Sequence, residues 1–143
     1  MIKSTAAWLQ ACVLIPNVLV QCGLSDGIKI APVDRPSTLE IMFWELKVSE
    51  LDAAKKPTYI TWKSDQNNAT EYSNGEALQR LVSGKIDIFS NNARTDSSMQ
   101  ILLQLIDSKF LENQWGIDIT TYEYDEHSNR YHYSFDIYTF ITG

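Results

Sequence analysis

Apolar residues recur at helical spacing near the start of the chain and form one broad face, made by Trp8, Leu9, Cys12, Val13 and Ile15. The pattern predicts a helix that Ser4 or Thr5 caps. We expect it to end at Pro16, because proline lacks the backbone donor that a helix interior needs. Val18–Gln21 then predicts a short strand. Gly23–Pro36 holds two glycines and two prolines and is therefore expected to be mostly a connection.

Strand-like and polar segments alternate in the central part of the chain. Thr38–Lys47 predicts a strand with apolar residues on both faces, so we expect both faces to be covered. Thr58–Lys63 predicts a second strand. Ser64–Gly75 is polar and contains an Asn-Asn pair and an Asn-Gly pair, which are turn signals. We therefore expect a loop there.

The third quarter of the chain contains one ambiguous segment and one clear helix. Glu76–Ser90 fits either a helix or a strand, although its end alternates as only a strand does. Asn91–Thr95 predicts a turn. Asp96 or Ser97 then caps a helix over Ser98–Asn113, whose apolar stripe consists of Met99, Leu102, Leu103, Ile106, Phe110 and Leu111.

The last segment predicts a β-hairpin. Gly116–Tyr124 alternates, Asp125–Asn129 is the turn, and Tyr131–Ile141 returns as a long strand. The order of elements predicts a single α+β domain over residues 1–143. We expect a mostly antiparallel sheet of about four to six strands, two helices packed on one face, and a C-terminal β-hairpin.

The charge of the chain narrows the classes of partner. Its 143 residues carry 12 Lys and Arg against 18 Asp and Glu, a net charge of −6. An acidic chain has no general attraction to a phosphate backbone, and the basic residues are scattered. No window reaches the roughly 18 apolar residues that a membrane span requires. The sequence therefore predicts neither nucleic-acid binding nor membrane insertion.

The N-terminus and the two cysteines bear on localisation. Gln10, Pro16 and Asn17 interrupt the apolar stretch, whereas a signal peptide needs about 7–15 unbroken apolar residues. An exported lipoprotein is the alternative that Leu19–Cys22 leaves open. Cys12 and Cys22 could form one bridge, but two reduced thiols in a protein made in a reducing compartment fit the composition better.

No residue pattern in the chain predicts catalysis, a cofactor or a metal. Asp87 and Asp118 are single carboxylates inside strands and read as solvent-facing positions. His127 and His132 lie five residues apart across a strand end and should point to opposite faces. There is no GxSxG elbow, GxGxxG motif or P-loop. We therefore expect a protein that is not an enzyme.

Aromatic residues are abundant, with four Trp and seven Tyr. The last strand carries aromatic side chains on both faces, so both need a cover. One cover is the helices of the domain, and the other is either a neighbouring subunit or a single aromatic-rich core.

Taken together, these segments resemble the tail-terminator (tail completion, or minor neck) proteins of long-tailed bacteriophages. The likeness covers residues 77–143 and the opening helix and strand. It would make Glu76–Ser90 a long strand with Gly84 inside it. It is carried by the order of Lys85–Ser90, an amphipathic helix over Ser97–Glu112, Tyr122–Asp125 and Tyr131–Tyr138.

The resemblance implies a structural role in the virion. Such proteins form a homohexameric ring at the head–tail neck that caps the tail tube, ends its polymerisation and joins the tail to the connector. The implied partners are other copies of the chain, the tail tube protein and a head-side connector or stopper protein. DNA would pass through the lumen without specific binding. The protein would be made in the host cytoplasm, with no cofactor.

Candidate interface residues follow from strand faces and polar loops. We expect Phe43, Tyr59 and Phe135 in the core. Subunit or tube contacts are expected at Trp44, Trp62, Asn67, Asn68, Tyr72, Asp125, Arg130 and Tyr138. The alternative function is a small acidic immunity or anti-defence protein that binds one basic partner.

Overall fold

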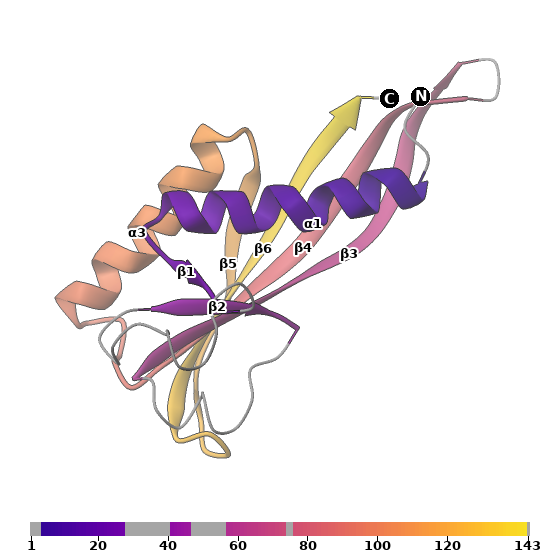
Figure 1. Ribbon diagram of the computed structural model, residues 1–143. Helices are drawn as coiled ribbons and strands as arrows, with labels where there is room; N and C mark the ends of the chain where they lie inside the picture. Colours follow the sequence, from indigo (N-terminus) through magenta and orange to yellow (C-terminus); the bar gives the residue numbers. More distant parts are fainter. Residues whose placement is uncertain (1–3, 28–40, 47–56, 74–75, 143) are drawn as a thin grey trace.

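The computed structural model describes residues 4–27, 41–46, 57–73 and 76–142. These residues form two helices and six strands in one mixed sheet (Figure 1). The elements are α1 (Ser4–Gln21), β1 (Ser25–Asp26), β2 (Met42–Glu45), β3 (Thr58–Ser73), β4 (Glu76–Ser90), α3 (Ser97–Glu112), β5 (Gly116–Asp125) and β6 (Arg130–Thr142). The fold class predicted from the sequence is confirmed.

The sheet has the order β1-β2-β3-β4-β6-β5. The β1/β2 and β2/β3 pairs are parallel, and the other three pairs are antiparallel. The β5 and β6 strands form the expected C-terminal hairpin, closed by the Asp125–Arg130 pair. β2 confirms the predicted strand over the part of Thr38–Lys47 that is described, and Met42, Phe43 and Trp44 are all buried.

The main core lies between one face of the sheet and both helices. Residues in register across the strands, such as Ile60, Ile88 and Tyr133, turn the same face toward α1 and α3. Ile15 and Leu19 of α1 are fully buried against it, as are Ile106 and Phe110 of α3. A smaller cluster of Met42, Trp44 and Tyr59, with Phe89 packed against it, lies on the opposite face.

Helix α1 continues through Pro16 to Gln21, so the predicted helix end and the predicted strand over Val18–Gln21 are wrong. An interior proline costs about 3 kcal/mol of helix stability. Ile15, Val18 and Leu19 continue the helical spacing and are buried against the sheet. Burying an aliphatic side chain contributes about 1.5–3 kcal/mol. Three such side chains outweigh the cost of the proline.

Strand β3 is the second difference from the sequence expectation. The sequence pattern predicts a strand that ends at Lys63, but β3 continues to Ser73, which pairs with Glu76 of β4. The predicted loop from Ser64 is therefore wrong over 64–73, and residues 74–75 lie outside the described part. Register shifts between Ser64 and Asn67 and between Ala69 and Glu71 accommodate the irregular segment.

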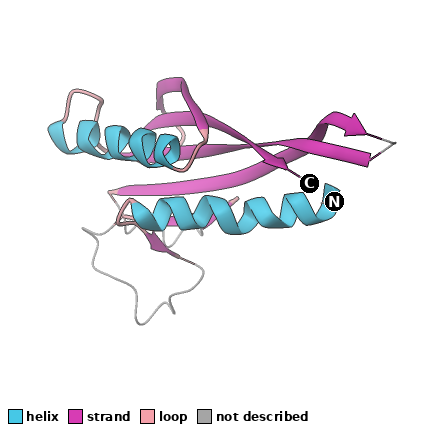
Figure 2. Cartoon of the chain, turned by 90° about the horizontal axis from the view of Figure 1, so that it is seen from above, coloured by secondary structure: helices cyan, strands magenta, loops and turns pink. Residues whose placement is uncertain are grey.

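The distal halves of β3 and β4 form an arm, which we define as residues 64–73 and 76–84. In both views the arm projects beyond the rest of the domain (Figures 1 and 2). Glu76–Ser90 is one continuous strand with Gly84 inside it, which confirms the interpretation that the family resemblance favoured. Helix α3 confirms the predicted turn and helix, with the Asp96 side chain accepting a hydrogen bond from the Met99 N–H.

Candidate functional site

The outer face of α1 is apolar although it is exposed. No charged residue occurs between Ser4 and Gln21. Leu9, Val13 and Val20 are 53%, 59% and 53% exposed, and half-buried Pro16 lies between them. The spacing of these four residues places them along one side of the helix. We call Leu9, Val13, Pro16 and Val20 the α1 stripe. The α1 stripe is therefore a candidate interaction surface.

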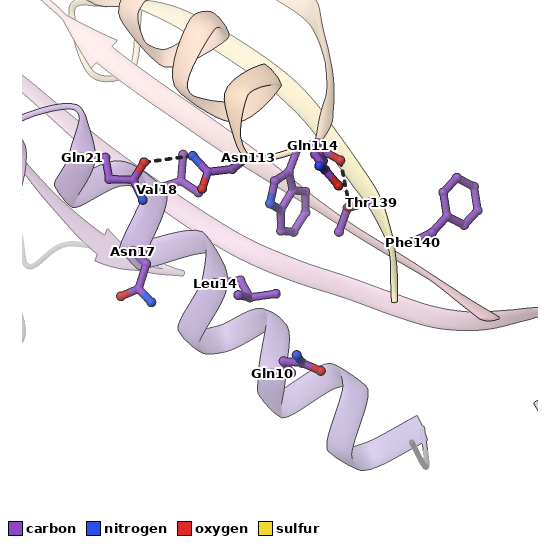
Figure 3. A pocket seen from close by; sticks show the side chains of 10 residues that line it. Gln10, Leu14, Asn17, Val18, Gln21, Asn113, Gln114, Thr139 and Phe140 are labelled. Carbon is purple, nitrogen blue, oxygen red and sulfur yellow. Dashed lines mark hydrogen bonds between the residues drawn. The ribbon is translucent and has the colours of Figure 1, made fainter. Parts of the chain in front are cut away.

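A groove runs beside the α1 stripe (Figure 3). Its open volume is about 440 Å³, and it is bounded by α1, the segment after α3 and the end of β6. None of the residues that line it carries a charge. Five have a carboxamide side chain, so we call it the carboxamide groove. Its lining residues are Gln10, Leu14, Asn17, Val18, Gln21, Asn113, Gln114, Trp115, Thr139 and Phe140.

Hydrogen bonds hold the end wall of the groove. The Asn113 side-chain amide donates to Gln21 Oε1 at 2.9 Å and to the Lys109 carbonyl at 2.7 Å. Thr139 Oγ1 donates to the Gln114 carbonyl at 3.0 Å (Figure 3). Trp115 is buried, and its ring meets Phe110 edge to face at 5.7 Å. The groove therefore has a fixed wall and side chains that both donate and accept hydrogen bonds.

The floor of the groove includes a free strand edge. β5 begins at Gly116, which pairs with Tyr138 of β6. β4 accompanies β6 further, to the Gln79–Thr142 pair. On the β5 side, residues 139–142 of β6 therefore have no partner among the described strands. Thr139 and Phe140 belong to this segment and line the groove, so the free edge and the carboxamides occur together.

A polar cluster lies on the face of the sheet away from the helices. Asp87 of β4 accepts a hydrogen bond from the Ser134 hydroxyl, and His132 Nε2 lies 2.8 Å from Asp87 Oδ1. The ring of His132 also stacks on Phe89 at 4.5 Å between centroids. Its Nδ1 lies 3.5 Å from Glu123 Oε1. One histidine ring is thus held by two carboxylates and an aromatic face.

The geometry of the Asp87–His132–Ser134 cluster differs from that of a hydrolytic triad. In a triad, one ring nitrogen accepts from the serine and the other donates to the carboxylate. Here Nε2 contacts both Asp87 and Ser134, the second at 3.1 Å. The Ser134 hydroxyl donates its hydrogen bond to Asp87, not to the histidine, and Ser134 is 2% exposed. The cluster joins β4 to β6.

The alternation of β4 predicts an isolated, solvent-facing Asp87, whereas the structure joins Asp87 to His132 and Ser134. The Asp87–Ser134 register between β4 and β6 brings them together. Alternation along a strand predicts on which face of the sheet a side chain lies, but not which residue of the next strand lies beside it. The register between strands 45 residues apart could not be derived from alternation.

Two of the residues expected at a subunit or tube interface, Trp44 and Trp62, are buried, so the prediction of an exposed contact at these positions is wrong. Trp62 packs in the main core under the helices, because it shares the face of Ile60 and Ile86. Trp44 lies on the opposite face, as expected, but it is buried there and its ring packs against Gly27. Of the residues expected in the core, Phe43 and Phe135 lie in the main cluster and Tyr59 in the smaller one.

The remaining expected interface residues fall in three separate places. Asn67, Asn68 and Tyr72 lie in β3 of the arm, and their side chains are outside the described part. Asp125 and Arg130 close the β5–β6 hairpin as a strand pair. Tyr138, at the other end of β6, is 42% exposed. The structure therefore does not gather the eight expected residues into one site.

The hairpin end holds its charges in local contacts. Asp125 accepts hydrogen bonds from the Ser128 hydroxyl and the His127 N–H, and the first of these chiefly lowers the pKa of its carboxyl. The Arg130 guanidinium lies 4.9 Å from the ring centroid of Tyr59. Burial raises the pKa of Tyr59, and Arg130 opposes that rise.

The described residues also bear on metal binding and on membrane insertion. They contain no group of three or more His, Cys, Asp or Glu side chains placed to hold a metal. Cys12 and Cys22 are free thiols. Within the described part, neither helix is long and apolar enough to span a membrane. The candidate contact surfaces of the described part are the α1 stripe, the carboxamide groove and the arm.

Comparison with known proteins adds no family to this description. No protein-family model matches the chain, and no curated protein matches it.

Proposed function

We propose that the chain is a virion structural protein of a long-tailed bacteriophage. In this proposal, copies form a homohexameric ring at the head–tail neck, cap the tail tube, end its polymerisation and join the tail to the connector. The observation that carries the proposal is the α1 stripe, because a charge-free helix with three half-exposed aliphatic side chains along one side offers an apolar contact surface to a neighbouring subunit.

A ring needs two different patches on every subunit, since head-to-tail contacts join unlike surfaces. The α1 stripe and the neighbouring carboxamide groove supply one such patch. The outer edge of β3 in the projecting arm supplies a second, since β4 separates it from β6 and the groove (Figure 1). This asymmetry favours a cyclic assembly over a two-fold dimer, in which the same patch meets itself.

The proposed partners beyond the ring are the tail tube protein and a head-side connector or stopper protein. The lumen would pass DNA without specific contacts, and the net charge of −6 suits such a lumen because it repels phosphate. The function requires neither cofactor nor catalysis.

The mass of the protein in solution tests the proposal. Light scattering over a range of protein and divalent-salt concentrations should reveal a species of about six subunits, and negative-stain images should show rings. A chain that remains monomeric at every concentration would contradict the ring. That outcome would favour the small acidic immunity or anti-defence protein, and capture of a single basic partner would then be the next measurement.

A further inference from the structure

We infer that the carboxamide groove binds the arm of a neighbouring copy as an added β-strand. The inference rests on the proposed ring and names the contact that would close it. The first ground is the free edge of β6 at residues 139–142, which continues the line of β5 beyond Gly116. An extended strand laid there would complete the sheet by main-chain hydrogen bonds.

The lining of the groove suits a peptide backbone. Gln10, Asn17 and Gln21 of α1 line one side of the groove, Thr139 and Phe140 of β6 line the other, and Asn113 and Gln114 lie at its end (Figure 3). Each carboxamide offers a donor and an acceptor, as each peptide group does. The absence of charge from the lining favours a neutral, hydrogen-bonding occupant over an ion. Phe140, 51% exposed, adds an apolar surface beside it.

The arm has the matching properties. From Ser64 onward, β3 pairs with β4 on one side and with no described strand on the other, because β2 ends at the Glu45–Trp62 pair. Among the described residues, this part of the β3 backbone is therefore a second open edge, already extended. Gln66, Asn67 and Asn68 give this stretch an uncharged, carboxamide-rich segment between Asp65 and Glu71, and this segment is the part that would enter the groove. The arm and the groove are different surfaces, so their contact is heterologous and can propagate around a ring.

Disulfide trapping between two single variants tests the contact directly. One preparation carries Asn67→Cys or Asn68→Cys in the arm, and the other carries Gln114→Cys in the groove. Both arm positions are needed, since adjacent strand residues point to opposite faces. All variants also carry Cys12→Ala, because Cys12 is a partly accessible thiol whereas Cys22 is buried. The control is Glu126→Cys, an exposed residue in the turn of the other hairpin.

On mixing and oxidation, a covalent heterodimer should form between an arm variant and Gln114→Cys. A heterodimer yield no greater than that of Glu126→Cys with Gln114→Cys would overturn the contact. A second measurement uses Asn17→Lys in Gln114→Cys chains, where a charge in the groove should lower trapping about tenfold or more. Gln104→Lys on the exposed side of α3 is the matched control and should leave the yield unchanged.

The outcomes separate this inference from the proposed function. Rings that form without arm–groove trapping overturn the contact and leave the ring proposal standing. Trapping that yields only open dimers, with no larger species in light scattering, supports the contact and contradicts the hexamer.

Discussion

Gly84 of β4 lies so close to the backbone of Lys63 that a Cβ atom on Gly84 would be 2.5 Å from the Lys63 carbonyl oxygen. The same atom would be 3.3 Å from Ile15 Cδ1, so the Ile15 side chain of α1 occupies the space beside Gly84 on the helix-covered face of the sheet. Gly84 is also the partner of Ser64, where the arm leaves the body of the sheet. The close approach of β3, β4 and α1 at the base of the arm therefore requires a residue without a side chain.

We expect Gly84→Ala to lower the free energy of unfolding by about 1–3 kcal/mol, because backbone atoms must move to admit the methyl group. Urea denaturation followed by circular dichroism measures it. Gly116→Ala is the matched control. There the obstacle is the ring of Tyr138, an exposed and rotatable side chain, and the loss should be smaller. Equal losses for the two variants would contradict the argument.

Pro16 interrupts the hydrogen bonds of α1 although the helix passes through it. Pro16→Ala should therefore raise the free energy of unfolding by about 1–3 kcal/mol, because alanine restores the backbone donor and removes the ring's clash with the preceding turn. The urea midpoint should rise. An unchanged or lower midpoint would mean that the proline shape itself contributes to packing on the sheet.

The errors at Pro16 and Ser64 have a common physical origin. Periodicity predicts which face of an element each residue lies on, and this sufficed for α3, β5, β6 and the end of β4, whereas the start of β4 fitted a helix equally well. It does not give the partner that an element finds elsewhere in the chain. α1 extends beyond Pro16 because the sheet buries Val18 and Leu19, and β3 extends beyond Lys63 because β4 supplies a ladder.

The candidate site was harder to predict than the fold for the same reason. The α1 stripe could have been anticipated from Leu9 and Val13, had the helix been extended to Val20. The carboxamide groove joins residues near position 15 to residues near positions 114 and 140, so no local pattern contains it. The Asp87–His132–Ser134 cluster likewise exists only through the β4–β6 register.

Asp87 and Ser134 are expected to be energetically coupled. Asp87→Ala removes the carboxylate to which the buried Ser134 hydroxyl donates and leaves that hydroxyl with the longer 3.1 Å contact to His132 Nε2, so the cost should be about 1–3 kcal/mol of the free energy of unfolding. Adding Ser134→Ala removes the poorly paired hydroxyl and should recover part of the loss. A double-mutant cycle measures this coupling. Strictly additive losses would show that the two side chains do not depend on each other.

Stability should fall in alkaline solution partly because of Cys22. Burial raises the pKa of the Cys22 thiol from its ordinary value of 9.0 to about 11. The raised value stabilises the fold below about pH 9, and that stabilisation is lost as the pH rises toward 11. The loss between about pH 8 and pH 10 should be about 1 kcal/mol greater in the wild-type chain than in Cys22→Ala. Parallel pH profiles for the two proteins would contradict this assignment.

The α1 stripe predicts a variant that separates assembly from folding. Val13 is more than half exposed, so Val13→Glu should change the free energy of unfolding of a single chain by no more than about 0.5 kcal/mol. In a ring the same residue would lie against a neighbour, and a buried unpaired carboxylate there should abolish the larger species in light scattering. Ile101→Glu introduces the same charge on an exposed aliphatic position of α3 and should leave the mass unchanged. If both variants retain the wild-type mass, the α1 stripe is not the subunit contact. If both reduce it to the monomer, the added charge acts on the assembly as a whole and not through α1.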